Sequence, residues 1–201
     1  MNSAAAASKG AQTRDAIVLA GYELARRVGL DGLTIGSIAA AVGMSKSGLF
    51  AHFGAREELQ LAVLAHAIDE VSNAAFRPAF TRKRGLTRLQ AVINGWLDFV
   101  STLDNGGCLI LAAVSEFDDK PGPVRDQLVR YQRQLREQME RTVEMAVESG
   151  EMRAQTDPAQ VAFELYGTFL VLHHDLRLFN DRGAVARTRM AADAILQRHL
   201  S

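Results

Sequence analysis

The stretch that decides the fold reads TIGSIAAAVGMSKSGLFAHF and runs from Thr34 to Phe53. Its apolar residues recur every three to four positions in two short groups, around Ile38 and around Leu49, which is the spacing of a helix with one buried face. Gly43 separates the two groups, and glycine tolerates the backbone angles of a tight turn. The stretch therefore predicts two short helices joined by a turn, which is the helix-turn-helix arrangement.

Hydroxyl side chains stand at the start of both expected helices. Thr34 and Ser45 are suited to the N-cap position, where a side-chain oxygen accepts a backbone N–H. Ser45, Lys46 and Ser47 also bring donors to the positive end of the second helix, where an anion such as a DNA phosphate is attracted. Gly48 has no side chain, so the backbone at this point can approach DNA closely. The second helix is therefore the candidate DNA-reading element.

The same helical spacing continues along the rest of the chain. No stretch alternates apolar and polar residues over the length of a strand, and clusters of β-branched residues are sparse. We therefore expect an all-α protein of about nine helices without a sheet. Besides the two short helices, the expected helices cover residues 13–28, 55–76, 86–103, 108–117, 124–150, 159–178 and 184–200, with Asn105-Gly106-Gly107 as a break between two of them.

Charge, cysteine content and hydropathy exclude several classes of protein. The 201 residues include 23 Lys+Arg and 23 Asp+Glu, so the net charge is zero and binding to nucleic acid has to be argued from local features. The single cysteine, Cys108, excludes an intramolecular disulfide and fits a reducing compartment. No window reaches the roughly 20 apolar residues of a membrane span, and the start does not read as a signal peptide. These features predict a soluble cytoplasmic protein with no membrane partner.

Residues 13–64 resemble the DNA-binding part of the TetR family of bacterial transcriptional regulators. The resemblance implies a ligand-released repressor that binds operator DNA and a small-molecule effector, without a cofactor. It implies a DNA-binding domain over residues 13–54 and an effector-binding and dimerisation domain over residues 55–201, after a tail, residues 1–12, whose composition predicts disorder. The matching positions are Gly32-Leu33-Thr34, Ile38-Ala39, Val42-Gly43-Met44-Ser45, Gly48-Leu49-Phe50, His52-Phe53 and Arg56-Glu57-Glu58-Leu59.

Two positions depart from the family's usual residues. Phe50 stands where tyrosine is common, so a hydroxyl that would donate to a phosphate is missing and we assign this ring to packing on the DNA backbone or sugar. Arg56 replaces the more frequent lysine, and a guanidinium adds a bidentate option toward phosphate. Neither change removes the expected affinity for DNA.

The candidate DNA contacts fall into a phosphate group and a groove group. Cations and N-cap hydroxyls suit phosphates, which set the position of a protein on DNA but carry no sequence information. Small and polar residues of the second helix suit the groove, and Lys46 reaching a guanine is an alternative to phosphate. The complete set is Thr34, Ser45, Lys46 and Arg56 for phosphate, Ser47, Gly48 and His52 for the groove, and Leu49 and Phe50 as packing residues.

A basic run farther along the chain is interpreted as a solvated loop. A helix of about 20 residues, at 1.5 Å each, would carry its end roughly 30 Å from the DNA-reading helix, too far for a second contact on the same site. The residues of this run are Arg77, Arg82, Lys83, Arg84 and Arg88.

The family resemblance also implies an effector cavity among the helices from Leu86 to Phe179. Most aromatic residues on apolar faces are plain core, and some would line the cavity. The candidate effector contacts are Trp96, Phe99, Cys108, Phe117, Tyr131, Phe163, Tyr166 and His173.

Two of these candidates have alternatives. Cys108 is either a small buried apolar residue or a reactive thiol at the start of a helix. In His173-His174-Asp175, adjacent imidazoles on a helix point about 100° apart, so they rarely bind one ion and we expect no metal site. A buried, hydrogen-bonded histidine or an effector contact is the preferred interpretation of His173.

The segment from Ala159 to Leu178 is apolar nearly all round. Such a helix must be covered on all sides, and one copy of this chain leaves one face bare. We therefore expect a homodimer in which the last two helices pack against the same pair of a second copy. A two-fold dimer of this kind presents its two DNA-reading helices to a palindromic operator.

Two rival functions are considered. A helical-bundle enzyme or carrier lacks support, because the chain shows no paired catalytic carboxylates in a known motif, no nucleophile elbow and no phosphate loop. We therefore expect no enzymatic activity. An activator or a constitutive DNA-binding protein stays open as an alternative to the repressor.

Overall fold

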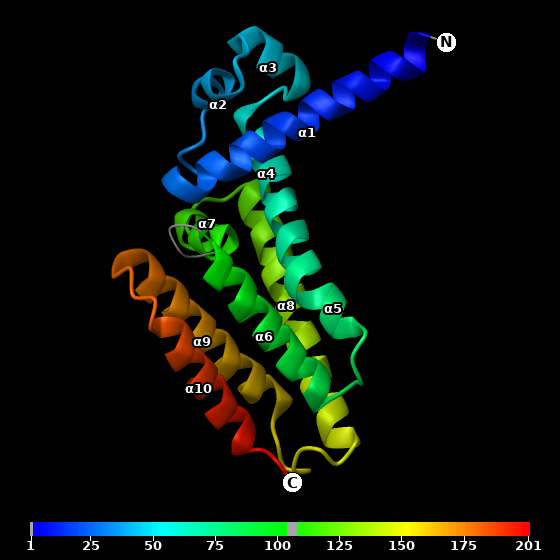
Figure 1. Cartoon of the computed structure of the whole chain (residues 1–201), viewed down its shortest axis with the longest axis vertical. Coiled ribbons are helices and arrows are strands. Elements are labelled where there is room, and N and C mark those ends of the chain that lie inside the picture. Colours follow the sequence, from blue (N-terminus) through cyan, green and yellow to red (C-terminus); the bar gives the residue numbers. More distant parts are fainter. Residues whose placement is uncertain (1, 104–107) are drawn as a thin grey trace. The chain divides into compact units, whose positions relative to one another are not determined.

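The structure, a computed structural model, describes residues 2–103 and 108–201, with side chains from residue 10 onward. The all-α prediction is confirmed: throughout these two ranges the elements are helices, and the only strand-like feature is an isolated bridge between Met152 and Leu200. The predicted break at Asn105-Gly106-Gly107 lies outside the described residues. The helices are α1 (Asn2–Val28), α2 (Ile35–Val42), α3 (Lys46–His52), α4 (Arg56–Val71), the π-helical segment η1 (Ser72–Phe76), α5 (Arg77–Phe80), α6 (Leu86–Thr102), α7 (Leu109–Phe117), α8 (Pro123–Glu148), α9 (Pro158–Leu178) and α10 (Ala184–Gln197) (Figure 1).

Because α4, η1 and α5 follow one another without a gap, the ten α-helices of the two described ranges form nine continuous helical stretches, as the sequence predicts. The first helix starts earlier than expected. The sequence predicts a disordered tail over residues 1–12, whereas α1 begins at Asn2. A run of four alanines, residues 4–7, explains the difference, because alanine has the highest helix propensity of all residues.

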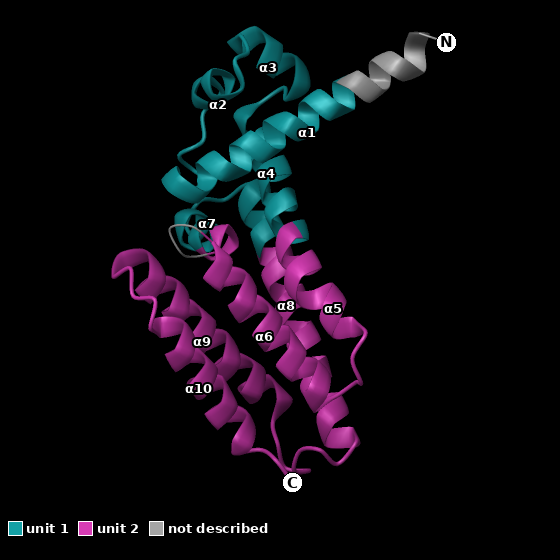
Figure 2. Ribbon diagram, in the orientation of Figure 1, with its two compact units in different colours: residues 1–69, 112–128 teal, residues 70–111, 129–201 magenta. Residues whose placement is uncertain are grey.

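The chain divides into two compact units, drawn in separate colours in Figure 2. Unit 1 comprises residues 1–69 and 112–128. In it α1 packs on α2 and α2 packs on α3, around apolar side chains that are fully buried. These side chains include Leu33, Ile38, Leu49, Phe53 and Leu59.

Unit 1 is larger than the DNA-binding domain predicted to end at residue 54. The start of α4 joins it because Leu59 and Val63 lie in the core with the helix-turn-helix. Residues 112–128 also join it: the carboxylate of Glu116 accepts a hydrogen bond from the backbone N–H of Asp31 at 2.7 Å. The two residues are 85 positions apart in the sequence, so the spacing of neighbouring residues could not predict this contact.

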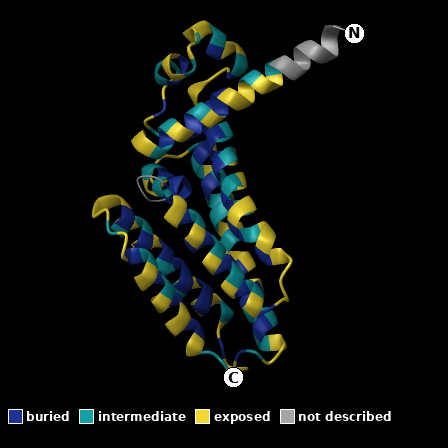
Figure 3. Ribbon diagram, in the orientation of Figure 1, coloured by how far each residue is buried: buried dark blue, intermediate teal, exposed yellow. Residues whose placement is uncertain are grey.

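Unit 2 comprises residues 70–111 and 129–201. Here α10 packs on both α9 and α6, and α6 also packs on η1 and α5. Figure 3 shows buried and exposed residues alternating along these helices, which is the pattern of amphipathic helices around a core. No helix in the described ranges is both long and apolar enough to cross a membrane.

The contact between α6 and η1 depends on Gly95. A Cβ atom at this position would lie 3.0 Å from the Cα of Ala75 and 3.3 Å from its carbonyl oxygen. Both neighbours are backbone atoms and cannot rotate away. Gly95 therefore sets how closely α6 approaches the π-helical segment.

Replacing Gly95 with leucine is expected to lower the free energy of unfolding by about 2 kcal/mol, because overpacking of this kind typically costs about 1–3 kcal/mol. Thermal and urea unfolding followed by circular dichroism measure the change. The matched control is Gly10→Leu, since a Cβ at Gly10 meets nothing within 4 Å. An unchanged midpoint for Gly95→Leu would show that α6 and η1 can separate without cost.

Candidate DNA-binding surface and effector pocket

The turn before α2 has the geometry that the sequence predicts. The hydroxyl oxygen of Thr34 accepts a hydrogen bond from the backbone N–H of Ser37 at 3.0 Å, and the hydroxyl oxygen of Ser37 accepts one from the N–H of Thr34 at 3.1 Å. This reciprocal pair is a capping box, which satisfies backbone donors at the start of a helix. At the other end of α2, Gly43 has φ 67° and ψ 28°, a left-handed conformation that glycine adopts without strain.

Helix α3 is capped and anchored from one side. The hydroxyl oxygen of Ser45 accepts a hydrogen bond from the N–H of Gly48 at 3.1 Å. Leu49 and Phe53 are completely buried, and the guanidinium carbon of Arg14 lies 4.4 Å from the centroid of the Phe53 ring. The buried side chains fix α3 in unit 1 and leave its opposite face to solvent.

The predicted DNA contacts differ in how far they are exposed to solvent. Lys46 and Ser47 are exposed, and Phe50 has half of its surface exposed on the same helix. Gly48 and His52 are half-buried. Leu49 has no exposed surface, so its part in the predicted set is that of an anchor. Thr34, Ser45 and Arg56 are exposed as well, although each already has hydrogen-bond partners within the protein.

Lys46 lies across the start of α2. Its Cε and Nζ atoms are 3.3 Å and 3.7 Å from the point where a Cβ on Gly36 would stand, and the Thr34 hydroxyl oxygen is 3.8 Å from the same point. The amine and the hydroxyl therefore gather at the positive N-terminal end of α2. The sequence pattern predicts Lys46 at the N-terminus of α3 and gives no sign of its proximity to α2.

Arg56, a predicted phosphate contact, already has hydrogen-bond partners within the protein. Its Nε donates to the carbonyl oxygen of Leu33 at 2.7 Å, and its Nη2 donates to the carboxylate of Asp31 at 2.9 Å and to the carbonyl oxygen of Asp31. The guanidinium thus holds the turn between α1 and α2, which reduces its freedom to clamp a phosphate. We therefore interpret Arg56 chiefly as a residue that supports the turn.

Asp31 is the centre of this polar group. Lys120 lies 2.6 Å from its carboxylate, and this hydrogen bond, followed by the charges of Lys120 and Arg56, holds the pKa of Asp31 below its usual value despite some burial. The ion pairs are half-exposed, so their contribution to stability is modest. Their importance is geometric, since they connect Arg56 and Lys120 to the turn that precedes the helix-turn-helix, and the Glu116 carboxylate is hydrogen-bonded to the same turn.

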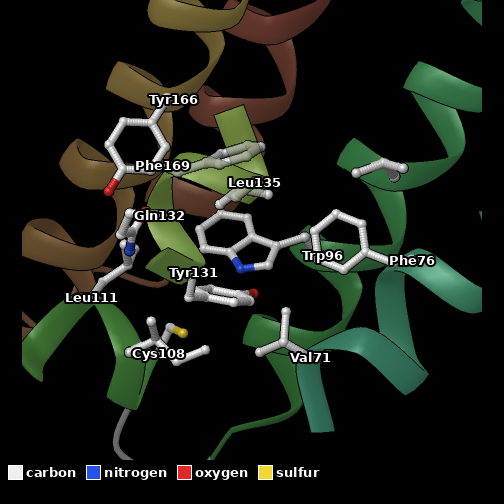
Figure 4. A pocket seen from close by; sticks show the side chains of 12 residues that line it. Val71, Phe76, Trp96, Cys108, Leu111, Tyr131, Gln132, Leu135, Tyr166 and Phe169 are labelled. Carbon is white, nitrogen blue, oxygen red and sulfur yellow. The ribbon is translucent and has the colours of Figure 1, made fainter. Parts of the chain in front are cut away.

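Unit 2 contains a narrow, mainly apolar pocket, whose free space is about 420 Å³ when the part open to solvent is counted (Figure 4). Four of the eight predicted effector contacts line it: Trp96, Cys108, Tyr131 and Tyr166. The rings of Trp96 and Phe169 lie 4.2 Å apart between centroids and are tilted by 33°. The lining residues outside the predicted set of contacts are Val71, Phe76, Val92, Ile110, Leu111, Gln132, Leu135 and Phe169, of which only Phe169 is among the aromatic residues that the sequence pattern places on apolar faces.

The other four predicted contacts lie elsewhere. Phe117 belongs to unit 1, and Phe163 is 62% exposed in a groove between α9 and α10. Phe99 and His173 are half-buried and do not line the pocket. Periodicity marks an apolar face but not which cavity that face borders, so these four could not be separated from the others.

The ionisable groups of the pocket are held neutral. Cys108 is 4% exposed, and burial raises the pKa of its thiol. Burial likewise raises the pKa values of Tyr131 and Tyr166. These shifts favour the small buried apolar residue as the interpretation of Cys108, because a reactive cysteine requires a thiolate.

His173 has a buried Nδ1 with no hydrogen-bond partner among the described residues, so the hydrogen-bonded histidine that we expected is not found. Burial, followed by the charges of Arg177 and His174, lowers its pKa to about 4. The described ranges contain no group of three or more potential metal ligands.

The pKa of His173 makes stability depend on pH. Between pH 6.5 and 4 the unfolded chain protonates this imidazole and the folded chain does not, so stability falls as the pH falls. The ring is partly exposed, so solvent weakens the effect. We expect the free energy of unfolding to fall by about 1 kcal/mol more over this pH window in the wild type than in His173→Gln. Urea unfolding at several pH values measures it, with His174→Gln as the exposed control. Parallel curves for the wild type and His173→Gln would contradict the assignment.

An apolar face remains exposed along α9 and α10. The groove between them has a volume of about 1130 Å³, including open solvent, and is lined by Gly167, Ala184 and Ala191 among others. Ion pairs between Arg198 and Glu164 and between Arg187 and Asp181 lie in this region. The exposed large apolar residues of the two helices are Phe163, Leu170, Val171, Leu178 and Met190, with Phe179 following α9.

Comparison with known proteins agrees with this architecture. Residues 85–192 match the domain described as "Tetracyclin repressor-like, C-terminal domain", and residues 17–63 match "Bacterial regulatory proteins, tetR family". The sequence has no significant match among curated proteins.

Several solved structures share the fold. A TetR transcriptional regulator from Chloroflexus aurantiacus J-10-FL has 23% identity and a TM-score of 0.87, covering 96% of this chain and 98% of that chain. A regulator from Saccharomonospora viridis in complex with choline has 18% identity and a TM-score of 0.78, covering 94% and 98%. AibR in complex with isovaleryl coenzyme A and operator DNA has 20% identity and a TM-score of 0.71, covering 93% and 97%.

The helix-turn-helix of unit 1, the helical unit with an internal pocket and the two matching domain descriptions lead to one conclusion. The chain belongs to the TetR family of bacterial transcriptional regulators.

Proposed function

We propose that this protein is a ligand-released repressor that binds a palindromic operator as a homodimer. The observation that carries the proposal is the arrangement of α3: Leu49 and Phe53 are buried while Lys46 and Ser47 face solvent. A short helix held from behind in this way presents its outer face to the major groove of DNA. The structure of AibR contains operator DNA and an acyl-coenzyme A, which supports this combination of partners in a protein of the same fold.

The DNA contacts are assigned from exposure and partners. Lys46, together with the Thr34 hydroxyl and the N-terminus of α2, is proposed to hold a backbone phosphate. Ser45 contributes chiefly as the cap of α3, and Phe50 packs on sugar or backbone. Ser47, Gly48 and His52 are proposed to face the groove, where sequence is read.

Dimerisation is proposed through α9 and α10. Phe163 and Val171 line the groove between these two helices and are 62% and 60% exposed, and exposed apolar surface of this kind usually marks an interface. A second copy of the same face would bury it in a four-helix contact, and the flanking ion pairs would form its polar rim.

The effector is proposed to act through α7. Ile110 and Leu111 in the first turn of this helix line the pocket, and Glu116 near its last turn accepts the hydrogen bond from Asp31. A ligand that moves the first turn therefore acts on the element that touches the turn before the helix-turn-helix. A coupling free energy of about 1–3 kcal/mol is enough to change operator affinity 5- to 150-fold.

The experiment that tests this function is operator binding by the full chain. Fluorescence anisotropy with DNA from the region upstream of the protein's own gene should show nanomolar affinity that falls steeply with salt concentration. A scrambled duplex of the same length is the control. Equal affinity for both duplexes would contradict a sequence-specific regulator. If every ligand that binds the pocket leaves the affinity for operator DNA unchanged, release by a ligand is contradicted.

A further inference from the structure

The effector pocket contains one polar side chain that the protein leaves without partners. Both the Nε2 and the Oε1 atoms of Gln132 are buried, and neither has a hydrogen bond among the described residues. Leaving a buried carboxamide unpaired costs free energy, because its hydrogen bonds to water are lost and not replaced. Figure 4 shows Gln132 among the side chains that line the pocket. A group within the pocket is therefore the natural partner for this amide.

The rest of the pocket wall is suited to an uncharged ligand. No charged side chain is among its described lining residues, and Cys108, Tyr131 and Tyr166 are held in their neutral forms. The guanidinium carbon of Arg136 lies 4.6 Å from the centroid of the Tyr166 ring, but Arg136 is exposed and does not line the pocket. A carboxylate or a quaternary ammonium entering here would lose its hydration without gaining a counter-charge.

We propose that the pocket selects an uncharged aryl or otherwise apolar ligand that carries one amide-like donor and acceptor pair, recognised by Gln132. A carboxamide offers both a donor and an acceptor, so an amide or lactam can form two hydrogen bonds with it, whichever way the side chain is turned. The rings of Trp96 and Phe169 provide apolar surface for the remainder of the ligand. This inference rests on the proposed function of the pocket as the effector site.

A matched set of four probes tests the selectivity. They are 3-phenylpropanamide, 4-phenylbutan-2-one, 3-phenylpropanoate and trimethyl(2-phenylethyl)ammonium, which share the phenylethyl group and differ in the polar end. Isothermal titration of the full chain should give the amide an affinity about tenfold above the ketone, which can only accept hydrogen bonds. The two ions should bind at least about 100-fold more weakly than the amide.

The variant Gln132→Leu keeps most of the side-chain volume and removes both polar atoms. It should reduce the amide-to-ketone affinity ratio from about ten to about one. It should also raise the unfolding midpoint of the ligand-free protein, since two unpaired buried atoms disappear. The matched control is Gln134→Leu, an exposed position on the same helix, which should leave the ratio unchanged.

Several results would overturn the inference. The first is that either ion binds as tightly as the amide. The second is that the preference for the amide over the ketone persists in Gln132→Leu. The third is that the amide does not bind at millimolar concentration. The titration contains no DNA, so it is independent of repression. An amide that binds through Gln132 without changing operator affinity would support the ligand class and contradict only the proposed release mechanism.

Discussion

Val171→Glu should convert the proposed dimer into monomers and abolish high-affinity operator binding. Val171 is 60% exposed on α9 and borders the groove between α9 and α10. In a two-fold interface the change buries two carboxylates without partners, and an uncompensated charge of this kind costs about 3 kcal/mol or more. The dimer dissociation constant is therefore expected to rise at least about 100-fold.

Sedimentation velocity over a concentration series measures the dissociation constant, and circular dichroism verifies that the monomer stays folded. The control is Phe80→Glu, which places the same charge at an exposed apolar residue of α5, outside the two helices of the proposed interface. A monomer contacts one half-site only, so operator affinity should fall together with dimerisation. A Val171→Glu protein that sediments as the wild-type dimer would place the interface elsewhere.

Lys46→Ala is expected to lower operator affinity about 100-fold in the dimer. Each copy loses a charge-assisted contact to phosphate of about 1.5 kcal/mol, and the two losses add because the copies are far apart on the duplex. The slope of log affinity against log salt concentration should become shallower by about 2, since one phosphate contact is lost from each copy. Because phosphates carry no sequence information, the loss should be similar for every duplex tested.

The matched control for Lys46→Ala is Arg84→Ala, which removes an exposed cation from the loop part of the basic run; Arg77 and Arg88, predicted in the same loop, lie in α5 and α6 instead. Arg84 lies in unit 2, between α5 and α6, and its removal should leave both the affinity and the salt slope unchanged. A loss confined to one operator sequence would reassign Lys46 to base reading. A loss with Arg84→Ala would show that the basic run contacts DNA.

The helix-turn-helix could be predicted in detail because its signals are local. The Thr34 and Ser45 caps and the left-handed Gly43 all follow from residue types within one or two turns of where they act. The burial of Leu49 and the exposure of Ser47 follow from helical periodicity, because residues two positions apart point to nearly opposite sides of a helix. These are short-range effects, and sequence spacing records them directly.

The lining of the pocket in unit 2 was predicted only in part, because its wall is assembled from distant segments. Trp96, Tyr131 and Tyr166 were found because large aromatic residues on apolar faces are few. Gln132 was missed, since a single glutamine on an amphipathic helix is normally a solvated residue. Its unpaired burial becomes visible only when α8 is placed against its neighbours.

The partners of Arg56 could not be predicted from the sequence either. From its position in the family motif it was expected to bind phosphate, yet its donors meet carbonyl and carboxylate groups of residues 31 and 33. The sequence contains the cation, but which anion or carbonyl reaches it depends on how the turn before α2 folds back. The same turn also receives Glu116 and Lys120, from some 85 to 89 positions away.

Helix positions, their caps and the outward face of α3 were thus already encoded locally, because backbone hydrogen bonds and side-chain periodicity act over three or four residues. The grouping of residues 112–128 with the first 69, the pocket lining and the partners of Arg56 and Asp31 arise from packing between distant segments. Such packing depends on the shapes and distances of whole helices, and no short stretch of the chain specifies them.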